Sequence, residues 1–116
     1  MNAFFYLASC DTCRKIMKSL PNLDKVALRE IKSEPMTPAE LDHLKQLAGS
    51  YEALFSRKAQ LYKSLQLKDK NLVESDYRNY ILQHYTFLSR PVLVTGSKIL
   101  IGNKPQTVAA MAEALG

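Results

Sequence analysis

The chain has 116 residues, of which 47% are hydrophobic and 23% are charged, and its formal net charge is +5. This hydrophobic fraction excludes a disordered chain, and the length predicts a single domain over residues 1–116. No apolar run approaches the roughly 20 residues of a membrane helix. Two cysteines are too few for the disulfide scaffold of a small secreted protein. The apolar N-terminal run lacks the basic start of a secretory signal, so we expect a cytoplasmic location.

The N-terminal third predicts a strand, a helix and a second strand. The apolar run Phe4–Leu7 has the length of a buried strand. Residues 11–20 change to a helical period, and Pro21 ends the helix. One face of this helix is apolar and consists of Cys13, Ile16, Met17 and Leu20. Residues 24–31 alternate imperfectly and predict a strand parallel to the first, since strand–helix–strand units are right-handed and parallel.

The stretch from about residue 37 to residue 85 predicts a helical insertion. Its first helix starts at Thr37-Pro38-Ala39-Glu40, which offers a cap, a first-turn proline and the acid of a capping box. Gly49 ends that helix. Two further helical stretches follow, over residues 50–67 and over residues 74–85. We expect the first of these to be broken.

The C-terminal part predicts a β-hairpin and a closing helix. Val92–Val94 and Lys98–Ile101 are joined by Gly96-Ser97, and glycine at the first turn position favours a type II′ hairpin. Pro105–Leu115 predicts the closing helix. The Arg90-Pro91 bond before the hairpin is compatible with a cis peptide. The elements together predict an α/β, thioredoxin-like fold: a mixed four-stranded sheet with helices on both faces and a helical insertion.

Cys10 and Cys13 form a C-x-x-C pair at the predicted strand-to-helix junction. The sulfur of Cys10 is expected to face the unpaired N–H groups of the first turn, which lower the thiol pKa and favour a nucleophilic thiolate. Arg14 and Lys15 add positive charge, while Asp11 opposes it. Cys13 lies on the apolar helix face, within reach of a disulfide, and we expect it to be less ionised and to resolve the adduct.

Other kinds of site are disfavoured by what surrounds the cysteines. A zinc site needs about four ligands, and the remaining soft donors, His43 and His84, lie in different predicted helices. We therefore predict no metal, although a pair of inert buried thiols stays an alternative. No glycine-rich phosphate loop is present. The Lys and Arg residues are spread along the chain, which argues against direct nucleic-acid binding, and no membrane contact is expected.

Four segments, in this order along the chain, resemble the arsenate reductase family of the ArsC and Spx type. They are Cys10-Asp11-Thr12-Cys13-Arg14-Lys15, Leu54-Phe55-Ser56-Arg57-Lys58, Leu88-Ser89-Arg90-Pro91-Val92-Leu93-Val94 and Ile101-Gly102-Asn103-Lys104-Pro105. The resemblance covers essentially the whole chain. It implies a thioredoxin-like fold with a helical insertion, a thiolate of Cys10 that attacks an oxyanion or a disulfide, and arginines around that thiolate.

The resemblance also implies the site residues. Cys10 and Cys13 are then the catalytic pair. The substrate-binding residues are Arg57, Arg90, Asn103, Lys104, Thr12 and Arg14. The arginines would hold an oxyanion through charge-assisted hydrogen bonds. In arsenate-reducing members the thiolate attacks arsenate, and glutathione then takes over the arsenic adduct. No bound cofactor is implied, and the reductant would be glutathione, glutaredoxin or thioredoxin.

The chain departs from arsenate-reducing members at two places. Their third arginine, after the Ile-Gly element, is replaced here by Asn103 and Lys104, and they usually lack a cysteine at the position of Cys13. The Spx branch has a C-x-x-C and uses it as a switch while binding RNA polymerase. The sequence therefore predicts a thiol-dependent reductase of a small anion or a mixed disulfide, with a redox protein as partner. The alternative is a redox-switched transcription regulator.

Overall fold

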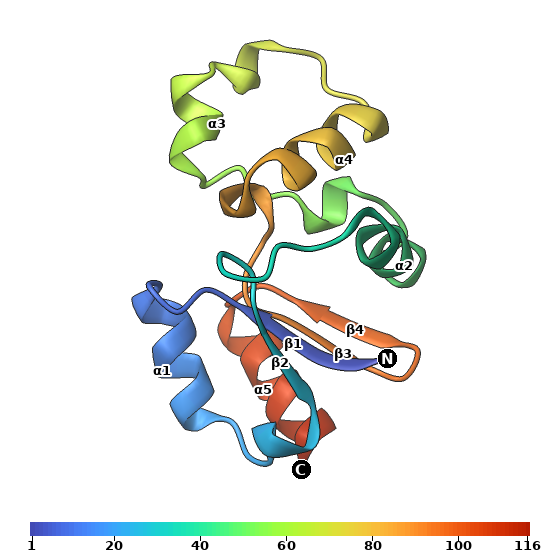
Figure 1. Ribbon diagram of the computed structural model, residues 1–116. Helices are drawn as coiled ribbons and strands as arrows, with labels where there is room; N and C mark the ends of the chain where they lie inside the picture. Colours follow the sequence, from blue (N-terminus) through green and yellow to red (C-terminus); the bar gives the residue numbers. More distant parts are fainter. The chain divides into compact units, whose positions relative to one another are not determined.

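The computed structural model describes residues 1–116, and the chain divides into two compact units. Unit 1 comprises Met1–Glu34 and Arg90–Gly116, and unit 2 comprises Pro35–Ser89. The predicted insertion, residues 37–85, falls within unit 2, while the prediction of a single domain stays a prediction. No helix has the length and hydropathy needed to cross a membrane. Figure 1 shows the elements of both units.

Unit 1 contains a mixed four-stranded sheet. Its strands are β1 (Asn2–Tyr6), β2 (Ala27–Glu30), β3 (Val92–Thr95) and β4 (Lys98–Ile101), in the order β2-β1-β3-β4. β1 runs parallel to β2 and antiparallel to β3, and β3 and β4 form an antiparallel hairpin. The predicted α/β class and mixed sheet are thereby confirmed. Gly96, with a φ of +62°, provides the left-handed residue that the hairpin turn needs.

Two helices cover one face of this sheet, α1 (Asp11–Ser19) and α5 (Pro105–Leu115). Because side chains alternate along a strand, every second residue of β1 and β3 points to this face. Strand and helix side chains form one buried cluster there: Phe4, Ile16, Leu20, Leu93, Met111 and Leu115. Burying each of the larger side chains contributes about 1.5–3 kcal/mol. This packing fixes α1 directly after the carboxyl end of β1.

The predicted strand over residues 24–31 is partly wrong. A 3-10 turn occupies Leu23–Lys25, after Asn22 in a left-handed conformation with a φ of 55°, and β2 includes only Ala27–Glu30. β2 lies at the edge of the sheet, and Leu28 is 46% exposed. An edge strand is paired on one side only, which explains why its apolar alternation is imperfect.

Unit 2 contains the helices α2 (Pro38–Ala48), α3 (Gln60–Ser64) and α4 (Glu74–Gln83). Three 3-10 turns alternate with them, at Glu52–Leu54, Leu67–Asp69 and Tyr85–Phe87. The predicted helix over residues 50–67 is indeed broken, and most of it is not α-helix. The helix predicted over residues 74–85 ends at Gln83. The ring of Phe55 lies at the centre of an aromatic cluster that also contains Tyr62, Tyr77, Tyr80 and Phe87.

The predicted capping box at the start of α2 is confirmed. The hydroxyl of Thr37 accepts a hydrogen bond from the backbone N–H of Glu40 at 3.1 Å, and the Glu40 carboxylate accepts one from the N–H of Thr37 at 2.9 Å. Pro38 occupies the first turn, and Gly49 ends the helix with a φ of 95°. Local sequence therefore determines both ends of this helix.

Candidate active site

Cys10 lies between β1 and α1, at the capping position of the helix, and its backbone is extended. Its N–H donates to the carbonyl of Leu7 at 3.1 Å, and its own carbonyl accepts from the N–H of Arg14 at 3.1 Å. These two bonds hold the turn from strand to helix. The Cys10 side chain is half-buried, and both cysteines are free thiols.

The environment of Cys10 favours the thiolate. Burial raises the pKa of its thiol, but the N–H and the thiol of Cys13, the N–H of Thr12 and the charge of Arg90 together lower the pKa below its ordinary value of 9.0. The side chain of Cys10 makes no capping hydrogen bond at the start of α1. The backbone N–H groups of Thr12 and Cys13 nevertheless lower the pKa of its thiol, because their partial positive charge favours a thiolate.

Cys13 is the opposite kind of thiol. It is fully buried, on the face of α1 that packs into unit 1. Burial, together with the charge and thiol of Cys10, raises the pKa of its thiol to about 11, although a hydrogen bond from the Leu7 backbone and the charge of Arg90 act in the opposite direction. As predicted, Cys10 has the lower thiol pKa of the two cysteines. A thiol of lowered pKa and a thiol of raised pKa therefore lie side by side.

The loop before Cys10 is held at Ala8 from two sides. The N–H of Ala8 donates to the Glu30 carboxylate at 2.8 Å, and the carbonyl of Ala8 accepts from Arg14 Nη1 at 2.7 Å. Glu30 also accepts from the N–H groups of Lys32 and Ser33. The N–H of Ala8 is the main cause that lowers the pKa of the Glu30 carboxyl, so the carboxylate form is favoured. Glu30 therefore joins the end of β2 to the cysteine loop.

Sequence reasoning missed this role of Glu30, which it treated only as a strand residue. The available signal was an acid at the carboxyl end of β2, beside the strand that precedes the C-x-x-C. Arg14 forms an ion pair with Asp11 besides its bond to Ala8. Its predicted contact with substrate stays a prediction.

Arg90 is the arginine that unit 1 itself places near the cysteines. Its charge lowers the thiol pKa of both Cys10 and Cys13, and its peptide bond to Pro91 is cis. The N–H of Gly102, which has a φ of 99°, donates to the carbonyl of Pro91 at 2.9 Å. This bond connects the Arg-Pro segment with the segment that continues into Asn103 and Lys104, both of which are exposed.

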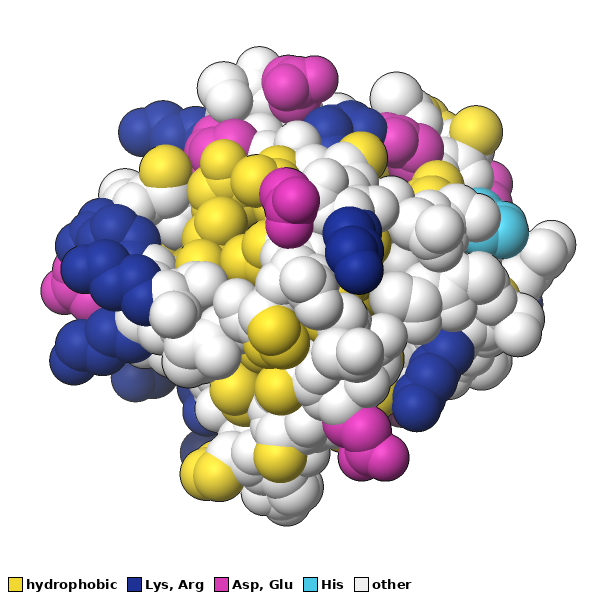
Figure 2. All heavy atoms as spheres, turned by 90° about the horizontal axis from the view of Figure 1, so that it is seen from below, with side chains coloured by type: hydrophobic (Ala, Val, Ile, Leu, Met, Phe, Trp, Pro, Cys, Tyr) yellow, Lys and Arg dark blue, Asp and Glu magenta, His cyan; other side chains and the backbone are white.

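The solvent-facing side of α1 is basic. Arg14, Lys15 and Lys18 are all exposed. In Figure 2, Lys and Arg side chains gather at the left of the face, the side on which Figure 1 draws α1. Such a surface attracts anions and acidic partners to the helix whose first residue follows Cys10.

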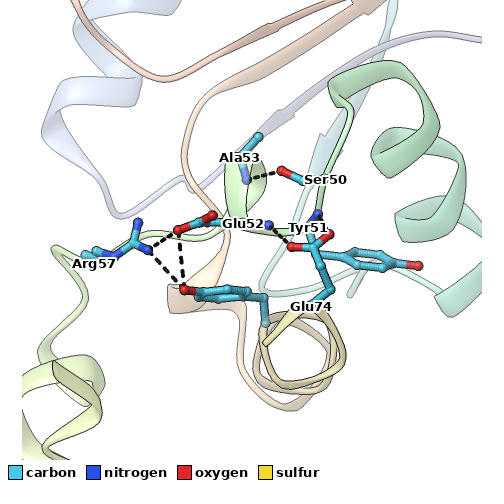
Figure 3. Close-up of polar contacts among 7 residues, drawn as sticks. Ser50, Tyr51, Glu52, Ala53, Arg57 and Glu74 are labelled. Carbon is cyan, nitrogen blue, oxygen red and sulfur yellow. Dashed lines mark hydrogen bonds and ion pairs between the residues drawn. The ribbon is translucent and has the colours of Figure 1, made fainter. Parts of the chain in front are cut away.

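Arg57 belongs to unit 2, where it contacts two side chains of that unit. Its Nη2 lies 2.5 Å from Glu52 Oε2 and 3.1 Å from the hydroxyl of Tyr77 (Figure 3). The hydroxyl of Tyr77 in turn donates to Glu52 Oε2 at 3.4 Å. The hydrogen bond to Glu52 is the main cause that raises the pKa of Arg57. Of the predicted site residues, unit 1 thus brings together Cys10, Thr12, Cys13 and Arg90, while Arg57 lies among residues of unit 2.

Comparison with known proteins relates the chain to the ArsC family. Residues 5–111 match the ArsC family. A 51-residue segment is 37% identical to an arsenate reductase of Haemophilus influenzae and spans 44% of each protein, less than half of that relative. The chain is thus a distant homologue of an arsenate reductase.

Solved structures extend the similarity to nearly the full chain. An ArsC-family related protein from Bacteroides fragilis is 25% identical, with a TM-score of 0.79 over 95% of this chain and 96% of that one. An arsenate reductase from Vibrio cholerae shares the fold at 24% identity, with a TM-score of 0.73 over 95% and 96% of the two chains. The matched residues and the shared sheet lead to one conclusion: the chain belongs to the ArsC family, which implies a thioredoxin-like fold.

Proposed function

We propose that the protein is a thiol-dependent oxidoreductase of the arsenate reductase type, with the Cys10 thiolate as nucleophile. One observation carries the proposal: a thiol of lowered pKa at the start of α1 lies beside a buried thiol of raised pKa. An attacking thiolate and a thiol held in reserve are what a two-step reduction requires. The substrate is a small oxyanion or a mixed disulfide, and no bound cofactor takes part.

In the first step the Cys10 thiolate attacks the oxidised centre. With an oxyanion such as arsenate, a sulfur–arsenic bond forms and an oxygen leaves as water after taking up protons. With a disulfide, a sulfur–sulfur bond forms and the other thiolate leaves. Arg90 supports this step, because its positive charge favours the thiolate and would stabilise the negative charge of a bound anion. The N–H groups of Thr12 and Cys13 act in the same direction.

In the second step a thiol attacks the sulfur of Cys10. The electron pair of the broken bond goes to the departing group, so arsenic(V) is reduced to arsenic(III) while two thiols become a disulfide. Cys13 can supply the second thiol, or glutathione can. Once Cys10 is in a neutral mixed disulfide, its charge no longer raises the pKa of Cys13. Glutathione, glutaredoxin or thioredoxin then returns the pair to its reduced form.

Charged side chains outside the cysteine loop would bind the substrate. Arg57 and Arg90 offer planar forks that match an oxyanion, whereas Lys104 offers a point charge and Asn103 a neutral amide. Arg14 adds its charge at the start of α1. These side chains favour a small anion as the substrate.

Turnover of arsenate and of a glutathione mixed disulfide tests the proposal, with glutathione, glutaredoxin and thioredoxin each supplied as reductant. We expect turnover by the wild type and none by Cys10→Ser. Cys13→Ser should keep the reaction only where glutathione replaces its thiol. If the wild type turns over neither substrate with any reductant, the proposal is wrong.

A redox-switched regulator is a second candidate, favoured by the contact between the two thiols. A disulfide between Cys10 and Cys13 would then change a surface that binds RNA polymerase. Binding to the polymerase α subunit, measured for the reduced and the oxidised protein, tests it. Equal binding in both states, or none, removes this candidate.

A further inference from the structure

The Arg57 side chain is held by an acid and a hydroxyl from its own unit. Its ion pair with Glu52 and its bond to Tyr77 both involve Nη2. The guanidinium also lies over the Tyr77 ring, with its central carbon 5.7 Å from the ring centroid. Glu52 is placed for this contact because the N–H groups of Tyr51 and Glu52 both donate to Glu74, at the start of α4, at 2.7 and 3.0 Å (Figure 3).

The choice of Nη2 has a chemical consequence. A guanidinium grips an oxyanion bidentately either end-on, through Nη1 and Nη2, or side-on, through Nε and Nη2. Both forks need an N–H of Nη2. Here one acceptor of Nη2 is a carboxylate oxygen and the other is the hydroxyl of Tyr77. An anion that binds through either fork of Arg57 must therefore compete with these contacts for Nη2.

We propose that Glu52, with Tyr77, is a specificity-determining residue at Arg57: it competes with the incoming anion for Nη2. A monocarboxylate offers no more charge than Glu52, which has the advantage of being tethered beside Arg57. A tetrahedral oxyanion with two negative charges is attracted more strongly and is the class that displaces Glu52. This inference rests on the proposed role of Arg57 in anion binding. Both side chains of the ion pair are about half exposed, 48% for Arg57 and 53% for Glu52, so the competition is modest and reversible.

Inorganic sulfate is a suitable probe, because it is a tetrahedral dianion that thiolates do not reduce. Its Kd is measured by NMR titration, with the Nε–H signal of Arg57 reporting on the site. For Glu52→Gln we expect a Kd about threefold lower than that of the wild type, as expected for an exposed ion pair. Tyr77→Phe keeps the ring in contact with Phe55 and changes no charge, and we expect a Kd about twofold lower. Formate should shift the Arg57 signal in Glu52→Gln and not in the wild type.

Two further variants separate the explanations. Asp69→Asn removes an exposed negative charge elsewhere in unit 2 and measures the general effect of net charge. Arg57→Lys removes both forks but keeps the charge. If Arg57→Lys weakens sulfate binding while Glu52→Gln does no more than Asp69→Asn, the competition is refuted and the role of Arg57 stands. An unchanged Kd in Tyr77→Phe refutes the part assigned to Tyr77. If Arg57→Lys leaves the Kd unchanged and the Arg57 signal does not move, the anion-binding role itself is wrong.

Discussion

α1 and α2 both begin after a residue with an extended backbone, but the two capping side chains differ. Thr37 and Glu40 complete a reciprocal capping box at the start of α2. At the start of α1, the side chain of Cys10 makes no capping hydrogen bond, and the N–H groups of Thr12 and Cys13 lower the pKa of its thiol. The first N–H groups of every helix lack partners within the helix. In α2 they stabilise the helix, whereas in α1 they stabilise a thiolate.

This difference should appear first in the chemistry of the two cysteines. In the wild type, limited alkylation by iodoacetamide at neutral pH should label Cys10 at least about tenfold faster than Cys13. The pKa of Cys10 lies below 9.0 and that of Cys13 at about 11, and the greater thiolate fraction outweighs the lower nucleophilicity of the more acidic thiol. Burial slows Cys13 further. Mass spectrometry with fragmentation locates the label on either residue.

The pH dependence of the alkylation rates shows which thiol has the lowered pKa and which has the raised pKa. Because folding lowers the pKa of Cys10, the rate at Cys10 should rise with pH and level off with a midpoint below 9.0, while the rate at Cys13 continues to rise toward pH 11. In denaturant the two rates should become similar, which provides the control. Faster labelling of Cys13 than of Cys10 in the folded protein would show that the comparison of the two helix starts is mistaken.

At the start of α2, removing the cap should change stability without changing thiol chemistry. Thr37→Ala should lower the free energy of unfolding by about 1 kcal/mol, because the N–H of Glu40 loses its acceptor. Urea unfolding measures the loss, and Thr37→Ser, which keeps the hydroxyl, is the matched control. The alkylation rate of Cys10 should equal that of the wild type. A stability loss as large in Thr37→Ser would mean that the hydroxyl bond is not what stabilises α2.

The smallest effect is expected when α1, like α2, receives an ordinary capping residue. Cys10→Asp gives α1 an ordinary cap, and at mildly acidic pH it should raise the free energy of unfolding by about 0.5 kcal/mol while abolishing turnover. The gain arises because a carboxylate accepts from the first-turn N–H groups more strongly than a neutral thiol does. A variant no more stable than the wild type in urea unfolding would show that the sulfur of Cys10 already caps α1 fully.

Arg90 and Arg57 show how much of the surroundings of a predicted site residue can be read from the sequence. The resemblance implies a site role for Arg90 in the segment just before the hairpin, and the charge of Arg90 lowers the thiol pKa of Cys10. Arg57 was singled out by resemblance alone, and nothing in its segment indicated that Glu52 and Tyr77 would hold its Nη2. Tyr77 is 20 residues away in the chain, so this contact has no local signal.

The sequence by itself determined the elements whose causes are local. The capping box of α2, the Gly96-Ser97 turn and the apolar face of α1 all follow from residues within one or two helical turns of each other. The expected nucleophile also follows, because the position of Cys10 at a helix start depends only on the strand and helix beside it. The predicted bounds of the edge strand β2 were partly wrong, because the exposure of this strand depends on which strands flank it and not on local sequence.

Only the tertiary structure decided how the loop of Cys10 is held. Glu30 reaches the N–H of Ala8 across 22 residues because β2 pairs with β1 and ends beside it. The bond from Gly102 to the carbonyl of Pro91 likewise depends on the pairing of β3 with β4. Hydrogen bonds between distant segments require the sheet to be formed first, and a pattern of residues along the chain contains no measure of that distance in space.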